Sequence, residues 1–182
     1  MMTLDTNQLD SVVRSWIVAH QTQTGLAIAA FVSKVGSVGP MRWASLLVAV
    51  FFFARGRGRA TLSVAAAPWL ALAAYAGIRR VWPRERPPGA AGFHEAASSF
   101  PSAHATTSTA VCCTLAYIIW RERMLSGRAA IAVAVLPPLC IGLSRLYLDV
   151  HWTTDVLGGW LVGVLVAFVA CGLYRLLPAK TE

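Results

Sequence analysis

The segment from Val156 to Leu173 reads VLGGWLVGVLVAFVACGL and contains no charged residue. Its length approaches the roughly 20 apolar residues that an α-helix needs to cross a bilayer. Four further apolar runs precede it in the chain: Met41 to Ala54, Thr61 to Ile78, Ala103 to Trp120, and Ala129 to Leu143. This repetition predicts an all-α fold, a polytopic bundle of transmembrane helices.

The composition of the chain supports a membrane protein. Of its 182 residues, 57% are hydrophobic and 13% are charged, whereas soluble domains carry roughly 25% charged residues. A formal net charge of +8 could indicate nucleic-acid binding. The arginines cluster at the ends of the apolar runs, however, where positive side chains meet the membrane surface. We therefore expect membrane lipids and no nucleic acid as partners, and the oligomeric state stays open.

The first forty residues are patterned differently, which suggests an N-terminal segment, residues 1–40, ahead of a transmembrane core, residues 41–182. Apolar side chains recur at helical spacing near the start of the chain: Leu9, Val12, Val13, Trp16 and Ile17. With polar residues between them, they suit a helix that lies in the membrane interface. The next stretch, Thr24 to Val38, is apolar but is interrupted by Lys34 and Gly36. It suits a partial or re-entrant span, and the pattern leaves open whether it crosses the membrane.

A loop from Arg79 to Phe100 contains several prolines and glycines, which favour turns and extended chain. If the apolar runs from residue 61 onward each cross once, this loop and the segment from Ser144 to Asp155 emerge on the same side. The short loops of the opposite side carry many cations: Arg55, Arg57, Arg59, Arg121, Arg123, Arg128, Arg175 and Lys180. The positive-inside rule assigns those loops to the cytoplasm. We therefore predict a multi-pass protein of the cell (inner) membrane whose 79–100 loop faces the periplasm or exterior, although that side is also basic.

Three polar motifs lie at the ends of the apolar runs: Arg79-x6-Arg86-Pro87, Pro101-Ser102-Ala103-His104, and Ser144-Arg145-x5-His151-x3-Asp155. Phosphoryl transfer depends on positioning and on stabilising negative charge, which metal ions or arginines supply. Arg79, Arg86 and Arg145 can present planar guanidinium groups to phosphate oxygens. The nearby carboxylates are scattered and form no cluster suited to magnesium: Glu85, Glu95, Asp149 and Asp155. The motifs therefore predict a phosphate site that uses no metal and no cofactor.

The histidines of these motifs can carry the chemistry. His151 and Asp155 are four residues apart, so they share a face if a helix starts near residue 151. Asp155 could then accept the Nδ1 proton and leave Nε2 free to attack phosphorus. His104 would protonate the leaving oxygen and later activate water. Ser102, with backbone N–H groups at a helix start near it, would complete an anion cradle.

Taken together, the motifs resemble the signature of the type 2 phosphatidic acid phosphatase (PAP2) superfamily of integral membrane lipid phosphatases: Lys-x6-Arg-Pro, Pro-Ser-Gly-His and Ser-Arg-x5-His-x3-Asp. The resemblance implies a PAP2/haloperoxidase-like core and a phosphohistidine mechanism without a metal. It implies His151 as nucleophile, Asp155 as its orienting residue, and His104 as general acid and then base. It also implies a phosphate-binding set: Arg79, Arg86, Ser102, Ala103 and Arg145. In this chain Arg79 replaces the family's lysine and Ala103 replaces its glycine.

The resemblance predicts an enzyme that hydrolyses a phosphomonoester or pyrophosphate of a membrane lipid. An outward-facing site on a short chain is most similar to polyprenyl pyrophosphate phosphatases, such as those acting on undecaprenyl pyrophosphate. Phosphatidic acid, phosphatidylglycerol phosphate, lipid A and polyprenyl-linked sugar phosphates stay open as substrates. Two other classes are less favoured: a vanadate-dependent haloperoxidase, because those enzymes are soluble, and a non-catalytic binder or transporter of lipid phosphates, because both histidines are present.

Overall fold

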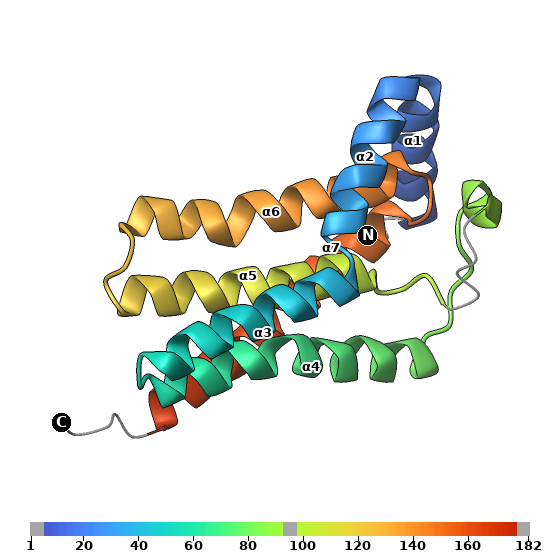
Figure 1. The fold of residues 1–182 in the computed structure, drawn as a ribbon. Helices are drawn as coiled ribbons and strands as arrows, with labels where there is room; N and C mark the ends of the chain where they lie inside the picture. The colour runs from blue at the N-terminus through green and yellow to red at the C-terminus, as the bar shows by residue number, and fades with distance from the viewer. Residues whose placement is uncertain (1–5, 93–97, 178–182) are drawn as a thin grey trace.

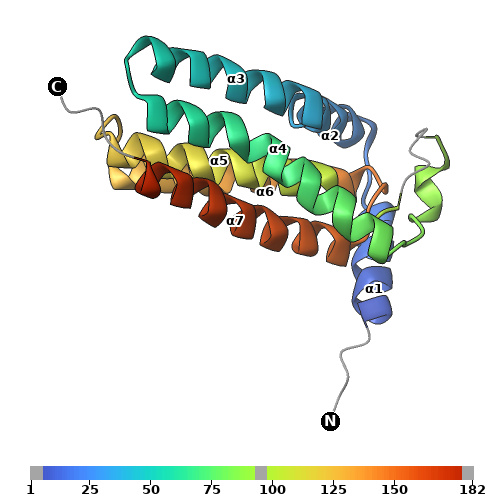
Figure 2. The same ribbon diagram turned by 90° about the horizontal axis from the view of Figure 1, so that it is seen from below.

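The computed structural model describes residues 6–92 and 98–177, and these are helical with no strand among them. Five helices lie side by side as a bundle, while two N-terminal helices stand at an angle at one end (Figures 1 and 2). The all-α prediction is confirmed. The elements in chain order are α1 (Thr6–Ala19), α2 (Gln23–Val35), α3 (Val38–Ala54), α4 (Gly58–Val81), the 3₁₀ helix η1 (Pro88–Gly92), α5 (Ala103–Arg121), α6 (Gly127–Tyr147) and α7 (Thr153–Leu176).

Three helices of the described chain, α4, α6 and α7, are each long and apolar enough to cross a membrane. Helices α2 and α3 pass the same test only as a pair, which is bent by 47° at the break between them. By length and composition, the stretch from Thr24 to Val38 therefore passes the test only together with α3. The bent pair has the form of a broken span or of a re-entrant loop.

Helix α5 lies at the centre of the bundle, in contact with α4, α6 and α7. Every residue from Ala105 to Cys112 is buried. Four of them carry hydroxyl groups: Thr106, Thr107, Ser108 and Thr109. Neighbouring helices rather than lipid surround these side chains, so α5 can occupy the bundle without the hydropathy that its lipid-facing neighbours need.

Small residues bring α7 close to α5. A Cβ atom added to Gly159 would lie 2.8 Å from the Cβ atom of Ala105, and one added to Gly163 would lie 2.6 Å from the Cβ atom of Thr109. Glycines four residues apart are a common means of close helix packing in membranes. This contact fixes the start of α7 beside the start of α5, where two of the three motifs lie.

Helix α1 turns Asp10 toward the bundle and leaves several large apolar side chains exposed. Asp10 is 1% exposed, whereas Val12 and Trp16 are 66% and 64% exposed. This orientation is the one that a helix in the membrane interface requires. Helix α1 stands at the end of the bundle that also carries the loop between α4 and α5 and the turn between α6 and α7 (Figure 1). The turns between α3 and α4 and between α5 and α6 lie at the opposite end.

Candidate active site

The chain reverses direction after α6 and delivers His151 to the site. Asp149 N–H donates to the Leu146 carbonyl (3.0 Å), and Val150 N–H donates to the Arg145 carbonyl (3.3 Å). These bonds form a Schellman ending, in which the residue at the Asp149 position adopts a left-handed conformation. Its φ is +53°, a value that glycine usually supplies and that aspartate tolerates better than most residues. This ending brings His151 back near Arg145, whose charge acts on the imidazole.

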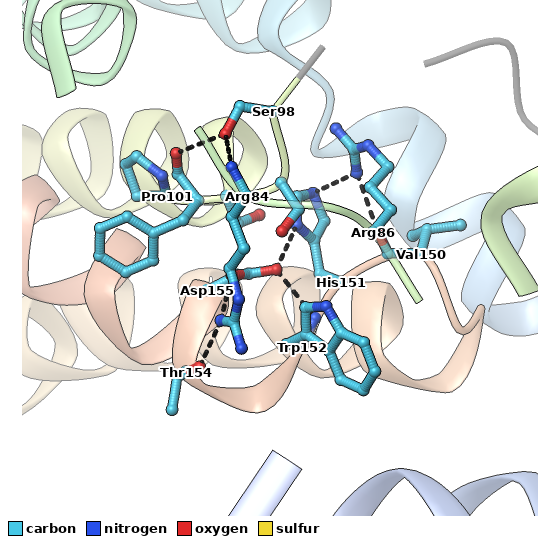
Figure 3. Close-up of polar contacts among 12 residues, drawn as sticks. Arg84, Arg86, Ser98, Pro101, Val150, His151, Trp152, Thr154 and Asp155 are labelled. Atoms are coloured by element: carbon cyan, nitrogen blue, oxygen red, sulfur yellow. Dashed lines mark hydrogen bonds and ion pairs between the residues drawn. The ribbon is translucent and has the colours of Figure 1, made fainter. Parts of the chain in front are cut away.

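Helix α7 begins at Thr153, two residues after His151. His151 and Asp155 therefore do not share a face of one helix. Asp155 reaches back instead. Its Oδ2 accepts the backbone N–H of Trp152 (2.9 Å) and lies 3.3 Å from Nδ1 of His151 (Figure 3). Both His151 and Asp155 are buried. The pairing expected from the sequence is therefore present, and it is made by a helix-capping carboxylate.

Arg86 fixes the tautomer of His151. Its Nη1 lies 3.1 Å from Nε2 of His151 and donates to the Val150 carbonyl at 2.8 Å (Figure 3). A guanidinium group has donors and no acceptor, so Nε2 must present its lone pair. The neutral ring then carries its proton on Nδ1, where Asp155 accepts it. The lone pair of Nε2 points toward Arg86, a cation that can bind phosphate.

The surroundings of His151 lower the pKa of its imidazole below the ordinary value. Burial has the largest effect because it disfavours the charged ring. The hydrogen bond to Asp155 opposes this effect, and the positive charges of Arg86 and Arg145 add to it. The lowered pKa keeps the imidazole neutral, and so nucleophilic, at neutral pH.

The second motif forms the start of α5. Ser102 is the N-cap residue, and its Oγ accepts the backbone N–H of Ala105 (3.5 Å). Its own N–H donates to the Asp155 carbonyl (3.0 Å), which joins the second motif to the third. Ala103 is the first residue of the helix, where backbone N–H groups have no partner within the helix. His104 follows it in the first turn and is half-buried.

The remaining two arginines of the predicted set line the same region. Arg79, in the last turn of α4, donates from Nη2 to the Pro101 carbonyl (3.2 Å), next to Ser102. Arg145 is buried in the last turn of α6 and donates to Ser33 Oγ of α2 (2.6 Å). The three motifs thus meet through hydrogen bonds at one end of the bundle, and α2 adds a hydroxyl to them.

Arg84 is a residue of this site that sequence reasoning missed. Its Nη1 donates to Oδ1 of Asp155 (2.7 Å) and to Oγ1 of Thr154 (2.6 Å). Its Nη2 donates to Oδ2 of Asp10 in α1 (2.5 Å). The only available signal was its place in the first motif, two residues before Arg86. Nothing in the sequence indicates a partner 74 residues away.

The described residues hold no metal-ligand cluster. In residues 6–92 and 98–177, no three histidine, cysteine, aspartate or glutamate side chains gather where a metal ion could bind. Glu95, one of the scattered carboxylates named above, lies outside the described residues. The positive charges around His151 come from arginines, which can hold phosphate oxygens by bidentate hydrogen bonds.

Residues 81–178, more than half of the chain, match the family model of the PAP2 superfamily. This chain belongs to the PAP2 superfamily. The match covers most of the site, from Arg84 to Asp155. It begins just after Arg79, the position at which the chain departs from the lysine of the family signature.

Two curated relatives resemble part of the chain. It is 42% identical to the decaprenylphosphoryl-5-phosphoribose phosphatase of Mycolicibacterium smegmatis over 121 residues, which are 64% of this chain and 62% of the relative. It is 35% identical to phosphatidylglycerophosphatase B of Bacillus subtilis over 92 residues, 49% of this chain and 45% of the relative. The chain thus spans about half to three fifths of the length of these two relatives.

The fold also resembles a crystal structure of a transmembrane PAP2 type phosphatidylglycerolphosphate phosphatase from Bacillus subtilis. The TM-score is 0.73 at 22% sequence identity, covering 98% of this chain and 90% of that chain. At this identity the likeness establishes a common fold. It includes the N-terminal helices α1 and α2, which lie outside the region matched by the family model.

Proposed function

We propose that this PAP2 protein is a lipid phosphatase that works through a phosphohistidine intermediate on His151. The observation that carries the proposal is the pair of contacts made by the His151 ring, from which its tautomer follows. Nδ1 is held by Asp155, and the lone pair of Nε2 faces Arg86. A nucleophile oriented by a carboxylate and aimed at a phosphate-binding cation is the arrangement that phosphoryl transfer needs. The names of both curated relatives, which are phosphatases, support the same reaction.

The reaction has two balanced steps. In the first, Nε2 of His151 attacks phosphorus and the bond between phosphorus and the lipid oxygen breaks. Protonated His104 gives its proton to that oxygen, so the lipid leaves as an alcohol, or as a monophosphate when the substrate is a pyrophosphate. In the second, neutral His104 takes a proton from water, the water oxygen attacks phosphorus, and the P–N bond breaks with its electron pair returning to His151.

The negative charge of the transferring phosphate is balanced by Arg79, Arg86 and Arg145, together with Ser102 and the backbone N–H of Ala103. Guanidinium groups and helix N-termini both bind phosphate oxygens well. We propose that this set makes a metal ion unnecessary. The substitution of Ala103 for the family's glycine keeps the N–H group, and that of Arg79 for lysine keeps the positive charge.

For the lipid, we propose a polyprenyl substrate and favour a polyprenyl pyrophosphate such as undecaprenyl pyrophosphate. The relative from Mycolicibacterium smegmatis, whose name describes a polyprenyl-linked sugar phosphate, supports the polyprenyl chain. The same relative favours a second candidate, the phosphomonoester of a polyprenyl-linked sugar. The name of the relative from Bacillus subtilis suggests phosphatidylglycerol phosphate as a further candidate substrate.

We further propose that the protein lies in the cell (inner) membrane with this site on the periplasmic or extracellular side. The support is the positive charge of the opposite end of the bundle. The connections from α3 to α4 and from α5 to α6 lie there, and Arg55, Arg57, Arg121 and Arg123 are in or next to them. In this arrangement residues 41–182 form the transmembrane core, and residues 1–40 form an interfacial or partly inserted helical segment. The lipid phosphate would reach the site from the outer leaflet.

Phosphate release from a panel of lipids, measured in detergent micelles with EDTA present, tests the proposed reaction. The panel contains undecaprenyl pyrophosphate, a polyprenylphosphoryl-ribose phosphate, phosphatidylglycerol phosphate and phosphatidic acid. We expect turnover of the polyprenyl substrates without added metal. His151→Ala should lose about 10⁴-fold or more in kcat, as removal of a nucleophile does elsewhere, and Asp155→Asn should lose less.

The variants also separate the alternatives. A wild-type protein that binds the lipids but releases no phosphate from any of them would be a binder and not an enzyme. Near wild-type turnover by His151→Ala would contradict the phosphohistidine mechanism. Turnover that requires magnesium would show that the arginines do not suffice.

A further inference from the structure

Arg84 lies between the N-terminal helix and the carboxylate that orients His151. We propose that Arg84, held by Asp10 of α1, is a positioning residue for Asp155, so that α1 is part of the catalytic apparatus. This inference rests on the proposed role of His151 as nucleophile. It assigns the first helix a task in the reaction, beyond attachment to the membrane surface.

The contacts of Arg84 form a continuous chain from α1 to His151. Oδ2 of Asp10 accepts from Nη2 of Arg84 (2.5 Å), Oδ1 of Asp155 accepts from Nη1 (2.7 Å), and Oδ2 of Asp155 faces Nδ1 of His151 (3.3 Å). The side chains of Asp10 and Asp155 are 2% and 0% exposed, and that of Arg84 is 23% exposed. A buried carboxylate depends on its partners, because water cannot replace them.

Arg84 completes the coordination of the Asp155 carboxylate. Oδ2 is already used by the Trp152 N–H and by His151. With Oδ1 held by Arg84, the carboxylate is fixed at both oxygens and cannot turn away from the imidazole (Figure 3). If Arg84 is removed, one oxygen of a fully buried anion loses a charged donor. The carboxylate then keeps only His151, the Trp152 N–H and the Ser99 side chain as partners, and it holds the imidazole of His151 less firmly.

Arg84 is itself held firmly, as a positioning residue must be. Its backbone N–H donates to Ser98 Oγ (2.9 Å), and its carbonyl accepts the Ser99 N–H (2.8 Å). Its guanidinium lies over the Trp152 ring, 5.6 Å from the ring centroid. Asp10 completes this support from the other side of the guanidinium group.

Asp10 also holds the first turn of α7 directly. Its Oδ1 accepts the Thr154 N–H (2.9 Å), and its Oδ2 accepts the Thr154 hydroxyl (2.7 Å). A carboxylate at a helix N-terminus is favourable because of the helix dipole. One residue of α1 therefore fixes both the arginine that holds Asp155 and the helical turn from which Asp155 projects.

The same helix offers a matched control. Arg14, one turn after Asp10, pairs with Asp149 through two hydrogen bonds (2.7 and 2.8 Å). This ion pair also fastens α1 to the site end of the bundle, but neither partner contacts Asp155. If α1 only needs to be attached, loss of either ion pair should have the same effect on activity. If Arg84 and Asp10 position Asp155, only their loss should slow the reaction.

The test compares kcat and KM of Asp10→Asn, Arg84→Gln, the double variant and Arg14→Gln, on the substrate that the wild type prefers. We expect Arg84→Gln to lower kcat about 10- to 100-fold, the loss typical of one charge-assisted hydrogen bond, with KM nearly unchanged. Asp10→Asn should lower kcat by roughly threefold to tenfold. Because Asp10 acts in part through Arg84, the double variant should lose less in kcat than the product of the two single losses. Arg14→Gln should keep the wild-type kcat.

A second measurement does not depend on turnover. In ¹⁵N-histidine-labelled protein, the Nδ1 proton of His151, assigned by its absence in His151→Ala, should give a downfield NMR signal because it bonds to a carboxylate. We expect this signal in the wild type and in Arg14→Gln, and its loss or upfield shift in Arg84→Gln and Asp10→Asn.

These outcomes separate the two proposals. An inactive wild type with the expected NMR pattern would overturn the proposed function and leave the positioning role of Arg84 and Asp10 supported. An unchanged NMR signal in both variants, or additive losses of kcat in the double variant, would overturn the positioning role. Equal loss of kcat in Arg14→Gln and Asp10→Asn would show that α1 serves only as an attachment.

Discussion

At the scale of single residues, the site depends on the charge state of His151. Burial and two neighbouring arginines lower the pKa of its imidazole, while the hydrogen bond to Asp155 works against them. An imidazole in such surroundings is a nucleophile over a wider pH range than a solvated one. The same cations are the groups proposed to bind phosphate, so one feature serves both purposes.

The pH dependence of kcat/KM should report this arrangement. In the proposed mechanism His151 attacks as the neutral ring, so its contribution to activity should be full above its lowered pKa and be lost as the pH falls through it. The acid limb should therefore lie below the ordinary histidine value of about 6.5. Arg86→Gln removes one of the charges that lower the pKa, so its acid limb should move to higher pH.

Arg80→Gln is the matched control for this pH profile, because Arg80 is exposed and adjacent to Arg79. Its acid limb should coincide with that of the wild type. All proteins are compared on one substrate, so ionisation of the lipid phosphate affects every pH profile equally and does not contribute to the difference between acid limbs. An acid limb that stays in place in Arg86→Gln would mean that His151 does not set it.

At the scale of helices, the contact between α5 and α7 decides how the motifs meet. It places Ser102 and Asp155 in direct backbone contact, with Gly159 and Gly163 packed against the first turns of α5. A side chain at either glycine would separate the helices or displace a backbone. The site therefore depends on glycines that lie about one and two helical turns beyond Asp155.

Gly163→Ala should destabilise the protein, because its Cβ atom would lie 2.6 Å from the Cβ atom of Thr109 and 2.7 Å from the Thr106 carbonyl oxygen. We expect a loss of about 1–3 kcal/mol in the free energy of unfolding, typical of overpacking. Unfolding by sodium dodecyl sulfate in mixed micelles measures it. Gly172→Ala in the same helix meets nothing within 4 Å and should be neutral or slightly stabilising. Equal stability of the two variants would contradict the close contact.

Much of the helical architecture could be predicted from the sequence, since apolar length is a property of each segment alone. The run from Ala103 to Trp120 corresponds to α5, which ends one residue later. Contacts between segments far apart in the sequence could not be predicted in this way, because no single segment indicates its partner. Neither the Asp10–Arg84 pair nor the left-handed conformation of Asp149 follows from local pattern, because aspartate occurs at many other positions and the expected glycine is absent. The three motifs were found because their order and spacing match a known signature.

At the scale of the whole molecule, the two ends of the bundle differ in their chemistry. The site end gathers the motif arginines with Asp10, Asp149 and Asp155. At the other end, Glu122 pairs with Arg57 and accepts the Tyr174 hydroxyl (2.6 Å), which ties the α3–α4 turn to the ends of α5 and α7. Arg55, Arg121, Arg123 and Arg128 are exposed at that end, which is the charge pattern that the proposed cytoplasmic orientation requires.

Cysteine labelling in intact cells tests this orientation. In a background whose four native cysteines are replaced by serine, Pro88→Cys should react with an impermeant thiol reagent, whereas Ser126→Cys should react only after permeabilisation. Both positions are exposed at opposite ends of the bundle. The reverse pattern would place the site in the cytoplasm and remove the case for an outer-leaflet substrate.

The hydroxyl-rich centre of α5 has a consequence for how the protein is made. The hydroxyls of Thr106 and Ser108 donate to carbonyls of the same segment, those of Ser102 and Ala105, whereas those of Thr107 and Thr109 have no hydrogen-bond partner among the described residues. Helix α5 is also not among the helices of the described chain that are long and apolar enough to cross a membrane by themselves. We therefore expect a chain that ends at Arg121 to insert α5 less readily than a chain that continues through α6 and α7, which cover it. The segment that brings the motifs together would then be the one that most needs its neighbours to enter the membrane.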